Sequence, residues 1–357
     1  MQDYDYIIIG GGASGLMMAY RMSKDSFFDD KSILILDKEK KSTNDRTWCY
    51  WQKEVDEWQD VVSKSWQKII FKSDENTIEE SILPYEYKMI RSKDFYFKIW
   101  NHLATKKNIN FIEANVVKIE QLNDAAEVKT SDNTYKTKLV INSVLFSDTY
   151  KKQTQYPLLQ QHFVGFFIKT KEPVFNDSVA TFMDFSIPQK GNTRFMYVLP
   201  YSKNEALFEY TLFSKDLLVY NDYVTEIERY LNAKNITDYE IIEKEQGSIP
   251  MTSYKFWKTN TKNIINIGTS GGWSKASTGF TFKNITKKTT ELINSIKQKK
   301  TPINFHKINK FWFYDLLLLD VLSEKNHLGA SIFGQMFKKN QPNEILKFLD
   351  EETSFSE

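Results

Sequence analysis

Short apolar runs separated by polar turns dominate the chain, and glycines follow the first run at once. An apolar strand is predicted at residues 4–9, and a glycine-rich turn at residues 10–15 leads into a helix. A second apolar strand is predicted at residues 32–36. Because a strand, a helix and a second strand in this order build a parallel sheet, the pattern predicts a βαβ unit at the start of the chain.

The remaining pattern predicts a mixture of helices and strands. Residues 92–103 repeat apolar side chains with helical spacing, and Ser92 is placed to cap that helix. Further helices are predicted at residues 216–231 and from about residue 281 to Ile296. Strands are predicted at residues 109–120, 126–143, 163–168, 180–185, 195–199, 206–213 and 263–267.

The first glycines have the spacing of a dinucleotide-binding turn. Gly10 permits the tight turn, Gly12 lets the backbone approach a pyrophosphate, and Gly15 lets the helix pack closely on the strand. The second strand ends at Asp37, where a carboxylate can accept ribose hydroxyls. The unit therefore predicts a site for FAD or NAD(P). Its expected contacts are Gly10, Gly12, Ala13, Gly15, Asp37 and Lys38.

A second glycine-rich segment, residues 268–280, follows a predicted strand and precedes a predicted helix. In FAD-dependent hydroxylases of similar layout a Gly-Asp pair faces the flavin here, whereas this chain has Thr269; a loop packed with small residues is the alternative. Two such helix N-termini favour FAD over a simple NAD dehydrogenase. Lys275 is expected either at the flavin edge or in solvent. The expected contacts are Thr269, Gly271, Gly272, Thr278, Gly279 and, from an earlier loop, Arg46, which could instead pair with Asp45.

These elements predict an α/β fold with a Rossmann-like FAD-binding domain of the glutathione-reductase and aromatic-hydroxylase type. An antiparallel sheet that forms the substrate domain is inserted into it, and a helical region ends the chain. The FAD-binding domain is expected at residues 1–60, 92–150 and 245–300, the substrate domain at 61–91 and 151–244, and the C-terminal helical region at 301–357.

Composition narrows the function classes. The 48 Lys and Arg against 46 Asp and Glu leave a net charge of +2, which gives no global field for nucleic acid. Cys49 is the only cysteine, so an intrachain disulfide is excluded, and the four histidines lack metal-ligand spacing. We predict no metal site. Aromatic residues make up 15% of the chain, which fits either an unsaturated apolar substrate or an ordinary large core.

Met1 leads directly into the first strand, and no apolar run approaches the ~20 residues of a membrane span. We therefore expect a cytoplasmic protein that is at most peripherally bound to a membrane. Residues 311–322 are the most apolar segment. As an interfacial helix the segment would lay Phe311, Trp312, Leu318 and Leu319 into the lipid boundary, although a helix that is apolar all round is at least as often buried.

With these motifs the chain resembles the bacterial flavin-dependent lycopene cyclases, specifically the β-cyclase type. The resemblance spans nearly the whole chain. It rests on DYDYIIIGGGASGL at 3–16, NDRTWCYW at 44–51, FMDF at 182–185, MYVLPYSKNEALFEYTLFS at 196–214, GSIPMT at 247–252, the glycines at 271–279, FYDLLLLDVL at 313–322 and KFLDEETSF at 347–355.

The resemblance implies acid-catalysed cyclisation of the linear ends of lycopene into β-ionone rings, by way of γ-carotene to β-carotene. It implies FAD in its reduced form, with NAD(P)H as the reductant. The expected partners are lycopene, other linear carotenoids and the membrane that holds them, which places the protein at the cytoplasmic side of the inner membrane.

The family's acidic motif falls on residues 207–211 and makes Glu209 the implied catalytic acid. A carboxyl beside Leu207, Phe208 and an apolar substrate would keep its proton, because its charged form is disfavoured there. A surface Glu on an edge strand is the alternative. The family often has a second carboxylate where this chain has Tyr210, which leaves a two-carboxylate relay open.

Aromatic side chains are expected around this acid, because each aromatic face can stabilise a cation by roughly 0.5–2 kcal/mol. Core packing is the alternative for each of them. The expected cavity residues are Trp48, Tyr50, Trp51, Phe182, Asp184 and Phe185.

Two other functions stay open. The first is an FAD-dependent oxidoreductase, either a hydroxylase or a geranylgeranyl-type reductase, that acts on an apolar substrate. Thr269 in place of the Asp, and Glu209 in its motif, argue against it. The second is a carrier of carotenoid or flavin without catalysis.

Overall fold

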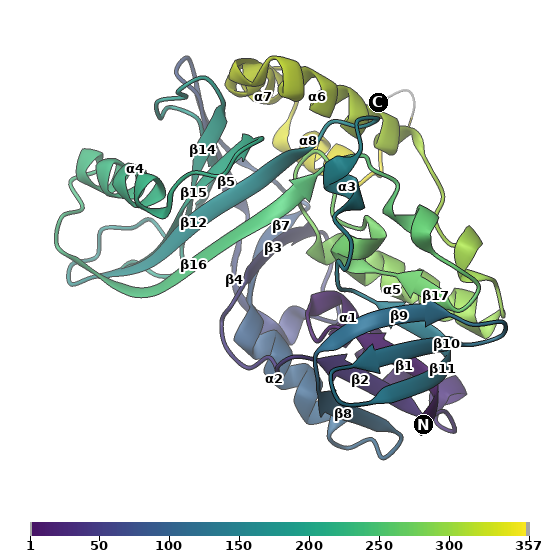
Figure 1. Cartoon of the computed structure of the whole chain (residues 1–357). Helices are drawn as coiled ribbons and strands as arrows, with labels where there is room; N and C mark the ends of the chain where they lie inside the picture. Colours follow the sequence, from purple (N-terminus) through teal and green to yellow (C-terminus); the bar gives the residue numbers. More distant parts are fainter. Residues whose placement is uncertain (1, 355–357) are drawn as a thin grey trace.

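A parallel βαβ unit opens the chain, as the hydrophobic pattern predicts. Strands β1 (Gln2–Ile9) and β2 (Ile33–Asp37) pair in parallel, and helix α1 (Ala13–Lys24) connects them. The computed structural model describes residues 2–354 (Figure 1). Met1 and residues 355–357, which belong to the predicted first and last regions, lie outside the described residues.

The first sheet has the strand order β8-β2-β1-β11-β10-β9, and β17 also pairs with β11. β11 has different partners along its length: its first half pairs antiparallel with β10, and its last three residues pair parallel with β17. The strands not yet given are β8 (Ile109–Glu113), β9 (Val116–Gln121), β10 (Ala126–Thr130), β11 (Thr134–Asn142) and β17 (Ile264–Asn266).

Both faces of this sheet are covered. Helices α1, α2 (Ser92–Leu103) and α5 (Phe282–Lys297) bury one face, where Ile8, Ile35 and Ile141 lie in one apolar cluster with side chains from these helices. On the other face, Ile7 and Leu34 lie in a second apolar cluster with side chains from β9, β10 and β11, the antiparallel part of the same sheet. The Rossmann-like α/β class is thus confirmed.

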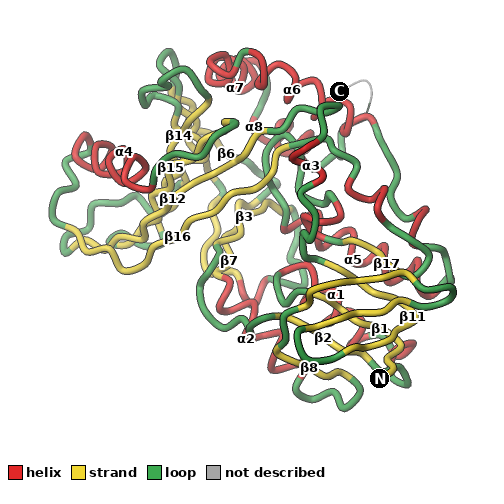
Figure 2. The backbone as a smooth tube through the Cα atoms, viewed as in Figure 1, coloured by secondary structure: helices red, strands yellow, loops and turns green. Residues whose placement is uncertain are grey.

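The second sheet is almost entirely antiparallel, with the order β16-β12-β15-β14-β13-β5-β6 (Figure 2). Only β13 and β5 pair in parallel among these strands. Their bounds are β5 (Lys68–Lys72), β6 (Thr77–Ser81), β12 (Leu159–Thr170), β13 (Ala180–Asp184), β14 (Thr193–Pro200), β15 (Glu205–Ser214) and β16 (Tyr239–Met251).

Side chains alternate between the two faces of this sheet. Phe208, Tyr210 and Leu212 face the helix α4 (Tyr220–Ala233), which begins four residues later than predicted because residues 215–219 form a loop. Leu207 and Phe213 face the opposite side, where the C-terminal helices pack. These helices are α6 (Lys310–Glu324), α7 (Gly329–Lys339) and α8 (Pro342–Leu349).

A small third sheet, β3-β7-β4, links the other two. Its strands are β3 (Thr47–Gln52), β4 (Val62–Trp66) and β7 (Glu86–Arg91). The predicted domain boundary at residue 245 falls inside β16, which continues to Met251 within the second sheet. Short helical turns fill the connections: α3 (Thr149–Lys152) and the 3-10 turns at Ser26–Phe28, Gln59–Val61, Phe256–Thr259, Gly268–Gly271, Pro302–Asn304 and Asn326–Leu328.

Ser92 does not cap α2, because it is the first residue of that helix. Its hydroxyl accepts a hydrogen bond from the backbone N–H of Arg46 at 3.1 Å and lies 3.1 Å from a carboxylate oxygen of Asp45. Ser92 therefore fixes the loop that leads into β3.

Helix α6 is partly buried, and its exposed face differs from the predicted one. Phe311 and Leu319, which were expected to enter lipid, are 4% and 0% exposed and pack inside the protein. Trp312 is also held, since its indole N–H donates to the carbonyl of Ser253 at 3.2 Å. Leu318 packs against the apolar cluster beneath the second sheet. The exposed apolar side chains are Phe313, Tyr314, Leu317 and Val321.

Replacement of Gly15 by alanine should destabilise the protein by roughly 1–3 kcal/mol, because a Cβ there would lie 1.9 Å from the carbonyl oxygen of Gly10. Urea denaturation of the apoprotein measures the change. Gly12→Ala is the matched control in the same turn: no described atom lies within 4 Å of its added Cβ, and its φ is −82°. Equal stability of the two variants would contradict the packing argument.

Candidate active site

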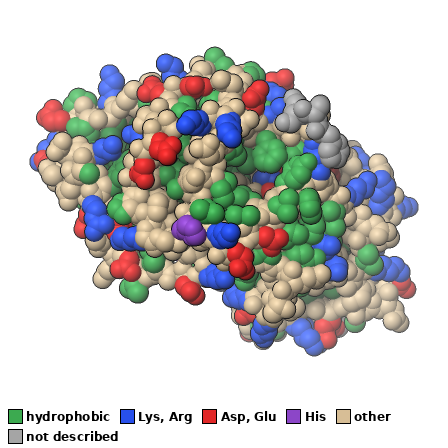
Figure 3. Space-filling model, turned by 90° about the horizontal axis from the view of Figure 1, so that it is seen from above, with side chains coloured by type: hydrophobic (Ala, Val, Ile, Leu, Met, Phe, Trp, Pro, Cys, Tyr) green, Lys and Arg blue, Asp and Glu red, His purple; other side chains and the backbone are tan. Residues whose placement is uncertain are grey.

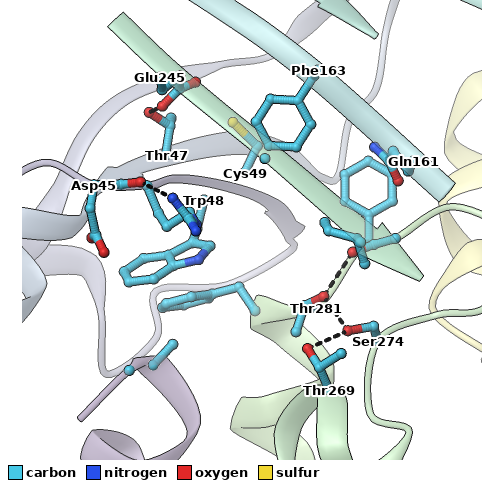
Figure 4. Close-up of a pocket in the computed structure, with 18 of the residues that line it drawn as sticks. Asp45, Thr47, Trp48, Cys49, Gln161, Phe163, Glu245, Thr269, Ser274 and Thr281 are labelled. Carbon is cyan, nitrogen blue, oxygen red and sulfur yellow. Dashed lines mark hydrogen bonds between the residues drawn. The ribbon is translucent and has the colours of Figure 1, made fainter. Parts of the chain in front are cut away.

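The second and third sheets and the N-terminus of α1 border a cavity of about 410 Å³, within the ~300–1,000 Å³ usual for small-molecule sites. Figure 4 shows Thr47 and Glu245 at one side of it and Trp48 across its middle. Thr269, Ser274 and Thr281 lie at another side (Figure 4). The cavity therefore combines residues from the second and third sheets, from the N-terminus of α1 and from the second glycine-rich segment.

The N-terminus of α1 faces this cavity. Gly12, Ala13 and Ser14 line it. Gly10 has a φ of +98°, a left-handed conformation that favours glycine and turns the chain from β1 toward the helix. Within the described part of the chain, no side chain caps this helix, so its first N–H groups remain available to an anion.

The N-terminus of α5 approaches the same cavity. Three of the residues that were predicted to contact a cofactor line it: Thr269, Thr278 and Gly279. The hydroxyl of Thr281 donates to Ser274 at 2.9 Å, and Ser274 lies 3.4 Å from the hydroxyl of Thr269 (Figure 4). Arg21 ties the two helices together through a 2.8 Å hydrogen bond to Thr289 of α5. Two helix N-termini are thus aimed at one space.

Two buried polar atoms at this side lack a hydrogen-bond partner among the described residues: Gln161 Oε1 and Thr278 Oγ1. Both residues line the cavity. Gly279 has a φ of +71°, and a Cβ added there would lie 1.9 Å from Gln161 Oε1. Since a buried polar group without a partner costs about 1–3 kcal/mol, these atoms fit a ligand with polar edges.

A pair of carboxyl groups lies at another wall. Gly165 of β12 pairs with Glu209 of β15 on one side and with Glu245 of β16 on the other. Directly opposite residues share a face of the sheet, so both carboxyls line the cavity. A Cβ at Gly165 would lie 3.1 Å from Cγ of Glu245 and 2.9 Å from Leu207 Cδ1. The glycine therefore leaves room for the two carboxyls to meet.

The surroundings raise the pKa of both carboxyls. Burial is the main cause for Glu209, whose pKa lies well above its ordinary value, and the charge of Glu245 raises it further. Burial also raises the pKa of Glu245, but the Thr47 hydroxyl, which donates to it at 2.7 Å, and the charge of Arg91 oppose this shift. Glu209 receives one such bond, from Thr211 at 2.9 Å.

Tyr210 does not take the place of a second carboxyl beside Glu209. It faces α4 on the other side of the sheet, where the guanidinium of Arg194 donates to its hydroxyl at 3.0 Å. Because side chains alternate along a strand, a carboxylate at position 210 would also point away from the cavity. A second carboxyl must reach Glu209 from another strand, and Glu245 does so from β16, across Gly165 of the strand between them.

Of the predicted cavity residues, Trp48 lines the cavity. The structure places the other five elsewhere. Tyr50 packs into the core of the first sheet, while Trp51, Phe182 and Phe185 pack into the core of the second. Asp184 is fully buried, and it accepts hydrogen bonds from the Tyr230 hydroxyl at 2.7 Å and from the backbone N–H of Ser186 at 3.0 Å.

Only some of the predicted cofactor-binding residues line the cavity. Arg46 lines the cavity, whereas the following predicted contacts do not: Gly10, Gly15, Asp37, Lys38, Gly271 and Gly272. Asp37 lies next to the first glycine turn and accepts a hydrogen bond from the backbone N–H of Gly11. Lys38 is exposed after it. Gly271 and Gly272 shape the second loop: a Cβ at Gly271 would lie 2.3 Å from the carbonyl oxygen of Asn266, and Gly272 has a φ of +70°.

Lys275 is neither at the cavity nor in solvent. It is 4% exposed and forms ion pairs with Asp315 of α6 at 3.0 Å and with Glu351 at 3.2 Å. Because breaking a buried ion pair is costly, these contacts hold the second glycine-rich loop against the C-terminal helices.

Sequence reasoning missed several cavity residues. Glu245 and Thr47 carry no local signal, since their position depends on which strands pair. Gln161 lies two residues before the predicted strand 163–168, in the part of β12 that the prediction left out, and its role follows only from its place beside Gly279. The remaining missed aromatic residues of the lining are Tyr87, Tyr96, Phe163, Tyr197, Phe280 and Phe282.

Glu209→Gln should be more stable than wild type, and the difference in the free energy of unfolding should grow as the pH rises. The raised pKa means that folded wild type holds a proton which the unfolded chain releases above about pH 4.5. Wild-type stability therefore falls as the pH rises through this window, by about 1.4 kcal/mol per pH unit. Urea denaturation of the apoproteins between pH 5 and 8 measures the difference. The exposed Glu240→Gln should leave the slope unchanged, and a constant gap between wild type and Glu209→Gln would contradict the shift.

Comparison with solved structures finds the same fold at low sequence identity. The HpxO protein of Klebsiella pneumoniae, solved as a variant complexed with FAD, has a TM-score of 0.70 at 11% identity over 98% of each chain. A geranylgeranyl bacteriochlorophyll reductase-like protein of Thermoplasma acidophilum has a TM-score of 0.63 at 11% identity, over 100% of this chain and 94% of that one. The p-nitrophenol 4-monooxygenase of Pseudomonas putida gives 0.65 at 11% identity, over 98% and 94%.

No curated protein matches the chain in sequence. The family model described as "Lycopene cyclase protein" matches residues 5–357. This match includes both glycine-rich segments, the strand with Glu209 and the C-terminal helices. The chain therefore belongs to the lycopene cyclase protein family.

Proposed function

We propose that this protein is a lycopene β-cyclase, which closes the linear ends of lycopene into β-ionone rings without net oxidation or reduction. The observation that carries the proposal is the carboxyl of Glu209, which lines an aromatic-rich cavity where burial raises its pKa. Membership in the lycopene cyclase family supports the same reaction. γ-Carotene would form first and β-carotene second.

FAD is the cofactor that fits this cavity best. The N–H groups at Gly12 to Ser14 would hold its pyrophosphate, and Asp37, which lies beside this turn and outside the cavity, would hold its ribose. The unpartnered oxygens of Gln161 and Thr278 would meet polar edges of the flavin. The complex of HpxO with FAD, which shares the fold, supports this assignment. When bound in reduced form, FAD supplies negative charge near the substrate, and NAD(P)H is proposed as its reductant.

Glu209 supplies the acid. Its raised pKa keeps the carboxyl protonated near neutral pH, as a general acid requires. The O–H bond breaks as a C–H bond forms at the terminal trisubstituted alkene of lycopene. The neighbouring double bond then attacks the tertiary cation, and loss of one ring proton gives the neutral β-ionone ring. Protons balance, and no electrons are transferred.

The cavity lining suits a short-lived cation. Trp48, Phe163, Tyr197 and Phe280 present aromatic side chains to it, and each face can contribute roughly 0.5–2 kcal/mol of cation stabilisation. Enclosure by these side chains would also exclude water, which would otherwise trap the cation as an alcohol.

The substrate requires access to a membrane, and we propose that α6 provides it. No helix among residues 2–354 is long and apolar enough to span a bilayer. Phe313, Leu317 and Val321 lie one helical turn apart and are 51%, 47% and 41% exposed. Figure 3 shows that hydrophobic side chains gather on the face viewed from above, with Lys and Arg side chains between them. Lys307 and Lys325, exposed near the two ends of α6, would meet lipid headgroups.

Glu209→Gln should abolish ring closure, because an amide cannot donate the proton, while FAD stays bound. Expression in a lycopene-accumulating host, followed by pigment chromatography, measures cyclic product, and the flavin absorbance of the purified protein measures FAD. Cyclic carotenoid formed at the wild-type level by Glu209→Gln would remove this residue from the acid role.

The double variant Phe313→Asp/Leu317→Asp should reduce binding to anionic vesicles at least ~tenfold, because two charges would enter the interfacial region. Cosedimentation with phosphatidylglycerol vesicles measures it. Val55→Asp, at a side chain that is 82% exposed in the loop after β3, is the control. Unchanged binding by the double variant would exclude α6 as the contact.

A further inference from the structure

We propose that Glu245 is the anionic partner of Glu209 in a pair of carboxyls that holds one proton between them. In this pair Glu245 acts as a positioning residue: its charge keeps the proton on Glu209 until the substrate takes it. The inference rests on the proposed cyclase function for its role in turnover, but the pair itself is a property of the chain.

Strand register brings the two side chains together. Glu245, Gly165, Glu209 and Tyr197 lie in one row across β16, β12, β15 and β14. The middle strand contributes a glycine, so no side chain separates the two carboxyls. Two enclosed carboxyls this close cannot both be charged without a large cost, and one proton removes the repulsion.

The donors around the pair decide which member is charged. The Thr47 hydroxyl donates to Glu245 at 2.7 Å, and the Arg91 guanidinium on β7 adds a nearby positive charge. Such partners stabilise a carboxylate. Glu209 receives one donor, Thr211. Glu245 is therefore the carboxylate, and Glu209 the carboxyl that donates to it.

The other groups near the pair leave this assignment intact. Arg91 also forms an ion pair with Glu243 on β16 and lies over the ring of Phe167, which fixes its position. Burial raises the pKa of each remaining neighbour, so these stay neutral: Cys49 on β3, Tyr87 on β7 and Tyr197 on β14.

The pair also accounts for the return of the proton. After Glu209 gives its proton to the alkene, two adjacent carboxylates remain. Their repulsion favours recapture of one proton when the ring C–H bond breaks and a carboxyl O–H bond reforms. The pair then holds one proton again, and the next cyclisation can begin without a second acid.

The direct test is the pH dependence of cyclisation by the reduced, FAD-loaded protein on lycopene in vesicles. Glu245→Gln removes the negative charge, which lowers the pKa of Glu209, so the alkaline limb of the rate profile should move to lower pH by ~1 unit or more. At pH 8 the rate should fall at least ~tenfold, with a smaller loss at pH 5.5. Glu245→Asp keeps the charge and should restore the limb, and Glu240→Gln, exposed on β16, should match wild type.

Infrared spectra of the apoproteins provide a second measurement that needs no turnover. Wild type at pH 8 should show a protonated carboxyl band that Glu209→Gln lacks and that Glu245→Gln loses at lower pH than wild type. An unmoved band and an unmoved alkaline limb in Glu245→Gln would overturn the pair. If the wild-type protein forms no cyclic product, the cyclase function fails, while the infrared titration still decides the pair.

Discussion

Enclosure of two carboxyls beside a glycine is the constraint on which the rest of this site depends. Glu209 and Glu245 face one cavity from β15 and β16. Gly165, on the strand between them, has no side chain that would separate the two carboxyls. Burial makes charge expensive there, so a carboxyl near neutral pH keeps its proton. A carboxyl that still holds a proton to donate at neutral pH thus arises from its position in the fold.

The rest of the fold completes the cavity beside these two carboxyls. The first sheet brings the N-termini of α1 and α5 to the opposite side of the cavity, and the buried contacts of Lys275 hold the second glycine-rich loop in place. In the proposed function these helix ends hold reduced FAD beside the substrate. A fold shared with monooxygenases and reductases would then support a reaction without net redox change, because its site, rather than its fold, determines the chemistry.

Local signals predicted the parts of the site that depend on local structure. The turn at Gly10 to Gly15 and the strand that carries Glu209 follow from spacing and motif. Glu245 was missed because its position depends on the register of β12 with two partners, which no local pattern specifies. Register also decides which aromatic residues line the cavity: Trp48 does, whereas its neighbours Tyr50 and Trp51 pack into the two cores.

The most direct test of the account is the source of the hydrogen added during ring closure. The protein, equilibrated in D2O with prereduced FAD under anaerobic conditions, would convert lycopene in a single turnover with enzyme in excess. The account predicts one solvent deuteron in the first ring that is closed, measured by mass spectrometry, and no NAD(P)H consumed per turnover. A product without solvent deuterium, or stoichiometric consumption of NAD(P)H, would contradict acid catalysis by Glu209.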